Sequence, residues 1–251
     1  MNPAWSPWTL GWTALALATF VFLFFRTAPY GRHAEGRWGP TIAHRVGWIV
    51  MEITSPIVLL AALWTTHDGS LSDLPSSHRV LVGLWLGHYA YRAVAYPFIM
   101  RWKHRRMPVL IMGSAVAFNL VNGGLNGTHL ALRPALSIDS PLFLIGGILF
   151  VAGLLINIHS DAILRSLRKP GETGYRIPEG GLYRFISCPN YFGELIEWIG
   201  FAMMAATPAA ITFAIWTAAN LIPRALAHHH WYRDRFEMYP AGRRAVVPFI
   251  L

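Results

Sequence analysis

Residues 157–191 of the chain read NIHSDAILRSLRKPGETGYRIPEGGLYRFISCPNY, and the rest of the sequence is organised around them. The stretch begins at the end of a strongly apolar segment and becomes basic and rich in glycine. It then enters a second apolar segment at Asn190 and Tyr191. Most of the remaining chain is apolar, so polar, charged and turn-forming residues are concentrated at what would be a membrane edge. We therefore expect the chemistry of the protein to lie here.

The composition is that of a membrane protein. Of the 251 residues, 54% are hydrophobic and 13% are charged, with a mean hydropathy of +0.39. Soluble domains carry about a quarter charged residues. The net charge of +9 lies in short clusters between apolar segments, which suits membrane topology better than a nucleic-acid surface. The single cysteine, Cys188, excludes an intramolecular disulfide.

The apolar segments predict an all-α bundle of seven transmembrane helices. A helix needs about 20 largely apolar residues to cross a bilayer. The candidate segments are 8–25, 46–66, 79–100, 108–128, 141–160, 190–206 and 208–230. The start of the chain, MNPAWSPWTL, lacks the basic residues of a signal peptide, so we expect the first segment to be retained. Residues 1–251 are predicted to form one transmembrane domain, with no soluble part.

Connections rich in Lys and Arg alternate along the chain with connections that have almost none. The basic clusters are Arg26, Arg32, Arg37 and Arg45; Arg101, Lys103, Arg105 and Arg106; Arg165, Arg168, Lys169, Arg176 and Arg184; and Arg233, Arg235, Arg243 and Arg244. The connections between these clusters hold almost no basic residue. By the positive-inside rule, this pattern predicts an N-terminus outside and a C-terminus in the cytoplasm.

Polar residues recur at spacings of three or four within the apolar segments. Residues at this spacing share one helix face, so each group can present a polar stripe to a common cavity. The groups are Asn157, Asp161, Arg165 and Arg168; Asn190, Glu194 and Glu197; Arg224, His228 and Tyr232; and Tyr89, Arg92 and Tyr96. Each side chain alone could equally form an interhelical hydrogen bond or reach water from a helix end. The matching period of four stripes favours a shared site.

The arginines of these stripes fit phosphate, which a guanidinium binds by forked hydrogen bonds. Carboxylates and amides beside them can bind hydroxyl or carboxamide groups. The combination suits a large anionic cofactor such as a dinucleotide, with Arg101, Lys103 and Arg176 as further basic residues nearby. No GxGxxG motif opens a βαβ unit, so this would not be a Rossmann site.

The three consecutive histidines 228–230 do not predict a metal site. Consecutive residues point about 100° apart around a helix, so they cannot converge on one ion. Cys188 lies at a predicted helix start, where cysteine can be activated. No basic partner is placed near Cys188 by spacing alone, so a structural role is the favoured interpretation.

Glu52 lies deep in segment 46–66 and is followed by Pro56, which frees backbone groups in the middle of the membrane. Freed backbone is tolerated where a helix lines a cavity. A carboxyl group in apolar surroundings tends to stay protonated and can donate a hydrogen bond. Together with Tyr89, Glu52 is our candidate for substrate recognition. The alternative is that Glu52 pairs with Arg92 as a structural contact between helices.

At these residues the sequence resembles the steroid 5-alpha-reductase family. The resemblance is carried by the stretch from Asn157 through FGELIEWIGF, by HHHWY with FEMYP and VVPFIL near the C-terminus, and by HYAYRAVAYP at 88–97. It implies a seven-helix membrane enzyme that reduces the 4,5 double bond of a 3-oxo-4-ene steroid with NADPH. Hydride would pass to C5, leaving an enolate at the C3 oxygen. The first four segments would form the substrate cavity, and residues 141–251 would bind the cofactor.

The resemblance also implies roles for single residues. Tyr89 and Glu52 match the pair that stabilises the enolate. The matching cofactor residues are Asn157, Asp161, Arg168, Tyr175, Arg176, Asn190, Glu194, Arg224, His228 and Tyr232. The chain departs from the family at Met51, where animal members carry Gln, and at Met100, where some carry Asn. Both departures bear on details of substrate and adenosine binding.

Rival interpretations remain open at this point. Relatives of similar architecture reduce enoyl-CoA or polyprenol double bonds, and a non-catalytic sterol-binding protein is a further alternative. A methyltransferase of related architecture would need Arg-His before Pro189, where this chain has Ser187-Cys188. We expect a lipophilic enone and membrane lipid as partners, and neither nucleic acid nor an obligate protein partner. The membrane would be the bacterial inner membrane or the endoplasmic reticulum, according to the source.

Overall fold

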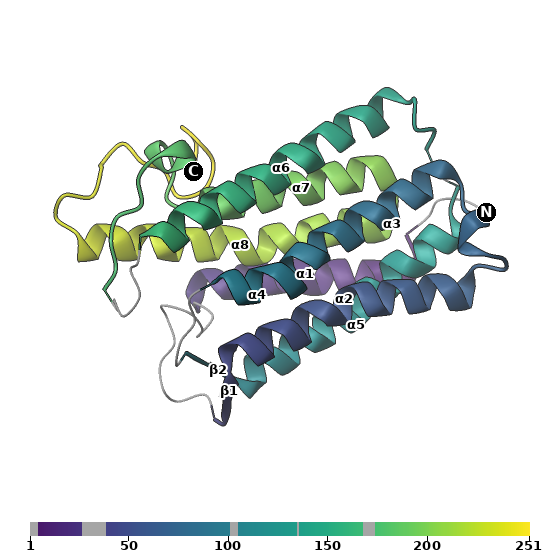
Figure 1. Cartoon of the computed structure of the whole chain (residues 1–251), viewed down its shortest axis with the longest axis horizontal. Coiled ribbons are helices and arrows are strands. Elements are labelled where there is room, and N and C mark those ends of the chain that lie inside the picture. Colours follow the sequence, from purple (N-terminus) through teal and green to yellow (C-terminus); the bar gives the residue numbers. More distant parts are fainter. Residues whose placement is uncertain (1–4, 27–38, 101–104, 135, 168–173) are drawn as a thin grey trace.

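The computed structural model describes residues 5–26, 39–100, 105–134, 136–167 and 174–251, and it is an elongated bundle of helices (Figure 1). The α-helices are α1 (Pro7–Phe25), α2 (His44–Thr66), α3 (Ser76–Tyr89), α4 (Tyr96–Ile99), α5 (Val109–Leu132), α6 (Pro141–Ser166), α7 (Pro189–Ala205) and α8 (Pro208–Arg235). A π-helix, η3 (Ala90–Ala95), joins α3 to α4. Short 3₁₀ turns lie at η2 (Leu71–Asp73) and η4 (Gly181–Arg184). The described part of the chain is mostly helical, which is consistent with the expected all-α membrane protein.

Three of the long helices begin with the same local chemistry. Ser6, Ser140 and Thr207 each accept a hydrogen bond from a backbone N–H of the first turn. Proline follows each of them, where its missing N–H costs nothing and its fixed φ suits the helix. The break at Thr207 therefore separates α7 from α8, as the sequence predicts.

Five of the described helices are long and apolar enough to cross a membrane: α1, α2, α5, α6 and α8. The predicted segment 190–206 is α7, which has 17 residues. The predicted segment 79–100 is not one regular helix, because the π-helix η3 interrupts it. In a π-helix the backbone hydrogen bonds span one residue more than in an α-helix, and such insertions are frequent at functional sites.

Glycines let α6 and α7 approach at backbone distance. A Cβ on Gly146 would lie 2.7 Å from the carbonyl oxygen of Gly200, and one on Gly193 would lie 2.7 Å from the backbone nitrogen of Asn157. Atoms cannot pack this closely, so only glycine fits at these crossing points. The two helices run side by side, with α8 next to α7 (Figure 1). This close approach brings Asn157 against α7.

The second close pair is α2 with α5. A Cβ on Gly123 would lie 3.0 Å from the carbonyl oxygen of Ser55, so a larger residue there would push the helices apart. The strands β1 (Thr41–Ala43) and β2 (Arg106–Pro108) pair antiparallel just before the two helices begin. They lie towards the same end of the bundle as the C-terminus, and α1 begins towards the opposite end (Figure 1).

Aromatic side chains fill the centre where α3, α7 and α8 meet. Trp85, Trp198 and Phe201 are at most 1% exposed, and their ring centroids are 5.1–5.7 Å apart. Phe213 of α8 completes the cluster, 4.3 Å from the ring centroid of Trp198. Tyr89 lies at the edge of this cluster, with its ring centroid 5.6 Å from that of Trp85 and 6.3 Å from that of Trp198.

Candidate active site

Arg92 lies at the centre of the candidate site and reaches two helices at once. Its Nη2 atom is 3.6 Å from Oε1 of Glu52 on α2, and its Nη1 atom is 3.8 Å from Oδ2 of Asp161 on α6. The guanidinium also lies over the rings of Trp48 and Tyr96, 4.8 Å and 4.7 Å from their centroids. A cation over an aromatic face is stabilised by the ring quadrupole. Arg92 therefore joins the predicted substrate residues to the predicted cofactor residues.

Tyr89 lies at the end of α3 and Glu52 lies on α2, and the two side chains are close enough to interact electrostatically. The Tyr89 side chain is buried beside Glu52 and the Ser55 hydroxyl. Ser55 follows Glu52 by three residues, so both lie on the same face of α2. The Glu52–Arg92 contact of the structural alternative is also present. Its length of 3.6 Å exceeds that of a hydrogen bond, so the carboxyl group keeps its capacity for another partner.

The stripes of α6 and α7 meet in one network of amides and carboxylates. Asn157 Nδ2 donates to the backbone oxygen of Asn190 at 2.9 Å and lies 3.5 Å from Oε2 of Glu194. Asn190 Nδ2 donates to Oδ1 of Asp161 at 3.3 Å. Asn157 and Asp161 are 2% and 1% exposed. Four of the residues predicted as cofactor ligands on these helices, Asn157, Asp161, Asn190 and Glu194, thus form one cluster.

Two acceptor atoms in this network are left over. Asn157 Oδ1 and Asp161 Oδ2 are buried, and no group among the described residues donates a hydrogen bond to either. Arg92 Nη1 lies 3.8 Å from Asp161 Oδ2, too far for a hydrogen bond. Buried acceptors are normally satisfied, so two that accept no hydrogen bond call for an explanation. A ligand that carries N–H or O–H donors, such as a carboxamide or a ribose, fits these atoms. This part of the NADPH hypothesis agrees with the chemistry of the site.

The stripe of α8 lies against the first turn of α7. Arg224 Nε donates to the hydroxyl of Tyr191 at 3.1 Å, and the Tyr191 ring is 5.7 Å from the imidazole of His228. The same imidazole has its Nδ1 atom 3.8 Å from Sγ of Cys188. Both Arg224 and His228 are 8% exposed. The α8 stripe therefore lies beside the network of α6 and α7.

The other predicted cofactor residues make separate contacts, are exposed or partly exposed, or lie outside the described residues. Tyr232 stacks on Tyr239 with ring centroids 5.4 Å apart, and Tyr175 packs on Trp231 at 4.9 Å. Arg176 is exposed. Arg165 is half-buried in the last turn of α6. Arg101, Lys103 and Arg168 lie outside the described residues.

The connection between α6 and α7 is tied down by Tyr183 of η4. Its hydroxyl donates to the backbone oxygen of Ser160 at 3.4 Å, and the side chain is 1% exposed. Burial raises the pKa of Tyr183 well above its ordinary value, because the charged phenolate would lose its hydration. The hydroxyl therefore stays protonated and can keep donating across the physiological range of pH.

Neighbouring histidines of α8 point to different partners. His228 turns towards Cys188, while Nδ1 of His229 is 2.6 Å from the hydroxyl oxygen of Ser187. Among the described residues, no three His, Cys, Asp or Glu side chains gather in a way that would hold a metal ion.

In the sequence, Arg92 belongs to one of the polar stripes, with a contact to Glu52 as an alternative, but no pattern gives Arg92 a central position or assigns His88 a role. The helical spacing of Tyr89, Arg92 and Tyr96 was the available signal for Arg92. His88 pairs with Glu197 of α7, with its Nδ1 atom 2.7 Å from Oε1. Nothing in the sequence relates these two residues, which are 109 positions apart.

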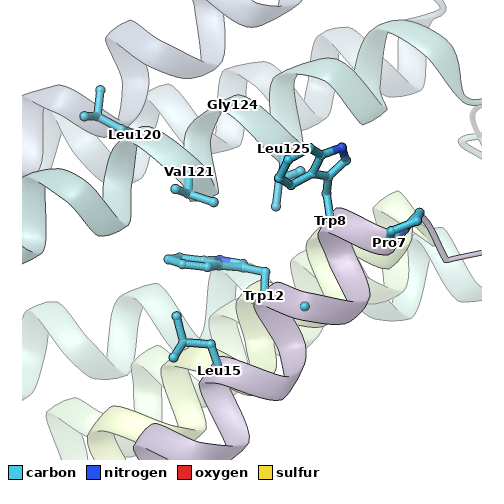
Figure 2. A pocket seen from close by; sticks show the side chains of 9 residues that line it. Pro7, Trp8, Trp12, Leu15, Leu120, Val121, Gly124 and Leu125 are labelled. Atoms are coloured by element: carbon cyan, nitrogen blue, oxygen red, sulfur yellow. The ribbon is translucent and has the colours of Figure 1, made fainter.

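A groove of about 750 Å³ lies between α1 and α5 (Figure 2). Its walls are apolar, with Trp8 and Trp12 on one side and Leu120, Val121 and Leu125 on the other. Behind the groove, the Trp12 ring packs on Trp216 of α8, with centroids 4.8 Å apart. Ligand pockets commonly have volumes of about 300–1,000 Å³, so the groove has room for a lipophilic molecule.

Comparison with known proteins gives close and extensive similarity. A family model described as 3-oxo-5-alpha-steroid 4-dehydrogenase matches residues 105–251. The chain is 40% identical to 3-oxo-5-alpha-steroid 4-dehydrogenase 1 of Homo sapiens over 240 residues, which cover 94% of this chain and 92% of the relative. It is 39% identical to steroid 5-alpha-reductase DET2 of Gossypium hirsutum over 248 residues, covering 94% and 93%. Animal and plant steroid reductases are thus similar over nearly the whole chain.

Proposed function

The chain belongs to the steroid 5-alpha-reductase family, and from that premise we propose that it reduces the 4,5 double bond of a 3-oxo-4-ene steroid with NADPH. It is an oxidoreductase that acts on CH–CH groups. Several long apolar helices and its relatives make it an integral membrane protein.

The observation that carries the proposal is the bridge made by Arg92 between Glu52 and Asp161. On one side of this cation lie donors suited to a ketone oxygen. On the other side lie buried acceptors suited to a carboxamide or a ribose. Enone reduction needs these two environments in contact, because a hydride must reach C5 while a hydrogen bond is made at the C3 oxygen.

Tyr89 and Glu52 act on the substrate carbonyl. Addition of hydride to C5 moves an electron pair to the C3 oxygen and leaves an enolate. Hydrogen bonds from Tyr89 and from protonated Glu52 strengthen as that charge develops, which stabilises the transition state more than the bound substrate. C4 then takes up a proton and the saturated ketone is released. Each double bond thus consumes one hydride and one proton.

Residues of the helices α6, α7 and α8 would hold NADPH, which would supply the hydride. Asn157 Oδ1 and Asp161 Oδ2 would accept hydrogen bonds from its polar groups, and Asn190 and Glu194 belong to the same network. Arg224 provides positive charge beside them. The remaining contributors to phosphate and adenosine binding are Arg101, Lys103, Arg165, Arg168, Tyr175, Arg176, His228 and Tyr232.

The chain crosses the membrane seven times, with the N-terminus outside and the C-terminus in the cytoplasm. The two crossings beyond the five long helices are α7 and the run α3–η3–α4. The groove between α1 and α5 receives the steroid from the bilayer, because its apolar walls match a lipophilic substrate. The cytoplasmic end of the bundle would give NADPH access to these residues.

The decisive experiment uses the full chain purified in detergent. Absorbance of NADPH is followed after addition of single substrates, and the products are analysed by mass spectrometry. The panel contains a 3-oxo-4-ene steroid, a 3-oxo-5-alpha-steroid as saturated control, an enoyl-CoA and a polyprenol, with NADH in parallel. Stoichiometric NADPH oxidation with a product heavier by two hydrogens is expected for the steroid enone. Turnover of enoyl-CoA or polyprenol alone would replace the substrate assignment. Tight steroid binding without NADPH oxidation would indicate a binding protein.

A further inference from the structure

His88 of α3 and Glu197 of α7 form a buried polar pair next to Tyr89. Nδ1 of His88 is 2.7 Å from Oε1 of Glu197, and the side chains are 3% and 0% exposed. Oε2 of Glu197 has no hydrogen-bond partner in the described part of the chain. Polar groups at membrane depth are costly, so a pair kept there usually has a function. The mechanism proposed above gives this pair no role.

The His88 ring contacts Tyr89 directly. Their ring centroids are 4.9 Å apart with the planes 73° to each other, an edge-to-face contact. Trp198 holds the same imidazole at 4.7 Å and 63°. Trp85 contacts the Tyr89 ring as well, at 5.6 Å. Glu197 and Trp198 therefore fix His88, and His88 and Trp85 fix the ring of Tyr89.

The backbone gives a reason why Tyr89 needs this support. Tyr89 is the last residue of α3, and the π-helix η3 begins at Ala90. The regular hydrogen-bond ladder thus changes immediately after Tyr89. Ala90 N–H is shared between the oxygens of Gly87 and Leu86. At such a junction the direction of a side chain depends on its packing more than it would inside a regular helix.

We propose that His88 and Glu197 are positioning residues that hold the Tyr89 ring in the orientation from which its hydroxyl reaches the substrate carbonyl. The inference rests on the proposed function, because that function assigns the hydrogen bond to Tyr89. The pair acts through Tyr89 and touches neither substrate nor cofactor. Its loss should therefore lower kcat while steroid KM and NADPH affinity stay within about twofold.

Two substitutions separate the hydrogen bond from the packing. His88→Phe keeps an aromatic edge against Tyr89 and removes the bond to Glu197. Glu197→Gln keeps the volume and one hydrogen bond to the imidazole, and should be milder. For His88→Phe we expect kcat to fall roughly tenfold to hundredfold, a part of the ~10²–10³ that loss of such a donor costs. His78→Phe is the matched control, because His78 is a buried histidine in the first turn of the same helix.

A double-mutant cycle decides whether the pair acts through Tyr89. In the Tyr89→Phe background the donor is already absent, so adding His88→Phe should lower kcat by less than about twofold. An equal loss in both backgrounds would overturn the inference and leave the pair with a structural role. If His88→Phe does not fold in detergent, the same cycle is run with Glu197→Gln.

The outcomes also distinguish this inference from the proposed function. A wild-type protein that reduces no enone of the panel overturns the function itself. An active wild type with an unimpaired Tyr89→Phe variant overturns the assignment of the donor, and the positioning role with it. An active wild type, an impaired Tyr89→Phe variant and an additive cycle overturn the positioning role alone.

Discussion

Tyr89 and Glu52 are side chains whose chemistry can be tested one atom at a time. Tyr89→Phe keeps the ring in its contacts with Trp85 and His88 and removes only the hydroxyl. Loss of one donor to a developing oxyanion should reduce kcat by about 10²–10³. NADPH affinity should be unchanged, since the cofactor network lies on other helices. Steady-state kinetics on a 3-oxo-4-ene steroid, with cofactor binding measured by fluorescence, checks both expectations.

Substitutions at Glu52 provide the matching comparison. Glu52→Gln keeps an N–H donor and should be milder than Glu52→Ala. Wild-type turnover in Tyr89→Phe would contradict the substrate assignment. It would instead favour the Glu52–Arg92 contact as a purely structural link between α2 and η3.

Arg224 is the described arginine that tests the cofactor site most directly. It is buried at 8% exposure and bonded to Tyr191, next to the network of α6 and α7. Arg224→Ala should weaken NADPH binding by roughly tenfold to over a hundredfold, because a charge-assisted hydrogen bond contributes about 1.5–3 kcal/mol. Arg168→Ala is expected to act in the same direction. Arg235→Ala is the control, since Arg235 is exposed at the end of the same helix. Wild-type NADPH affinity in both Arg224→Ala and Arg168→Ala would exclude the two arginines from the cofactor site.

At the scale of elements, the contact between α6 and α7 decides whether the cofactor network can form. A Cβ at Gly153 would lie 2.5 Å from the backbone nitrogen of Glu197, so Gly153→Ala must push the two helices apart. Overpacking of this kind costs about 1–3 kcal/mol. We expect a lower thermal midpoint and weaker NADPH binding, because Asn157 would move away from Asn190. Gly147→Ala is the control, since its Cβ meets only the Met204 sulfur at 3.6 Å. If Gly153→Ala and Gly147→Ala bind NADPH with the same affinity, the glycine contact between α6 and α7 is not required for cofactor binding.

The groove between α1 and α5 gives a second prediction at this scale. Gly11 lines the groove, and a Cβ there would meet no atom within 4 Å, so Gly11→Phe should fold and fill the space. If steroid enters along the groove, KM for the steroid should rise several-fold while NADPH affinity stays constant. Gly83→Phe is a matched control on α3, because its Cβ would also meet open space. An unchanged KM in Gly11→Phe would exclude the groove as the substrate path.

At the scale of the whole molecule, the alternation of basic connections predicts the orientation in the membrane. Helix α1 begins towards one end of the bundle, and α8 ends at the other (Figure 1). A C-terminal fusion to a reporter that fluoresces only in the cytoplasm should be bright. A fusion after residue 70, in the connection between α2 and α3, should be dark. Brightness in both fusions would refute the predicted orientation.

The sequence alone determined the class of the protein and the start of several helices. Ser6, Ser140 and Thr207, each followed by proline, mark where α1, α6 and α8 begin, because capping depends only on neighbouring residues. The composition indicated a membrane protein, and the spacing of polar residues indicated which of them share a helix face. The family resemblance, which the comparisons confirm, supplied the reaction.

Only the tertiary structure decided which polar faces meet. The helical period predicts which residues share a face, but it does not predict which helix packs against that face. The partner helix depends on where two backbones can come close together, as they do where Gly193 of α7 meets the backbone of Asn157 on α6. Likewise, the junction of α3 with η3 sends Arg92 to Glu52 and Asp161 together and leaves His88 facing Glu197. Such contacts join residues far apart in the chain, so their pairing follows from packing and cannot be read from local sequence.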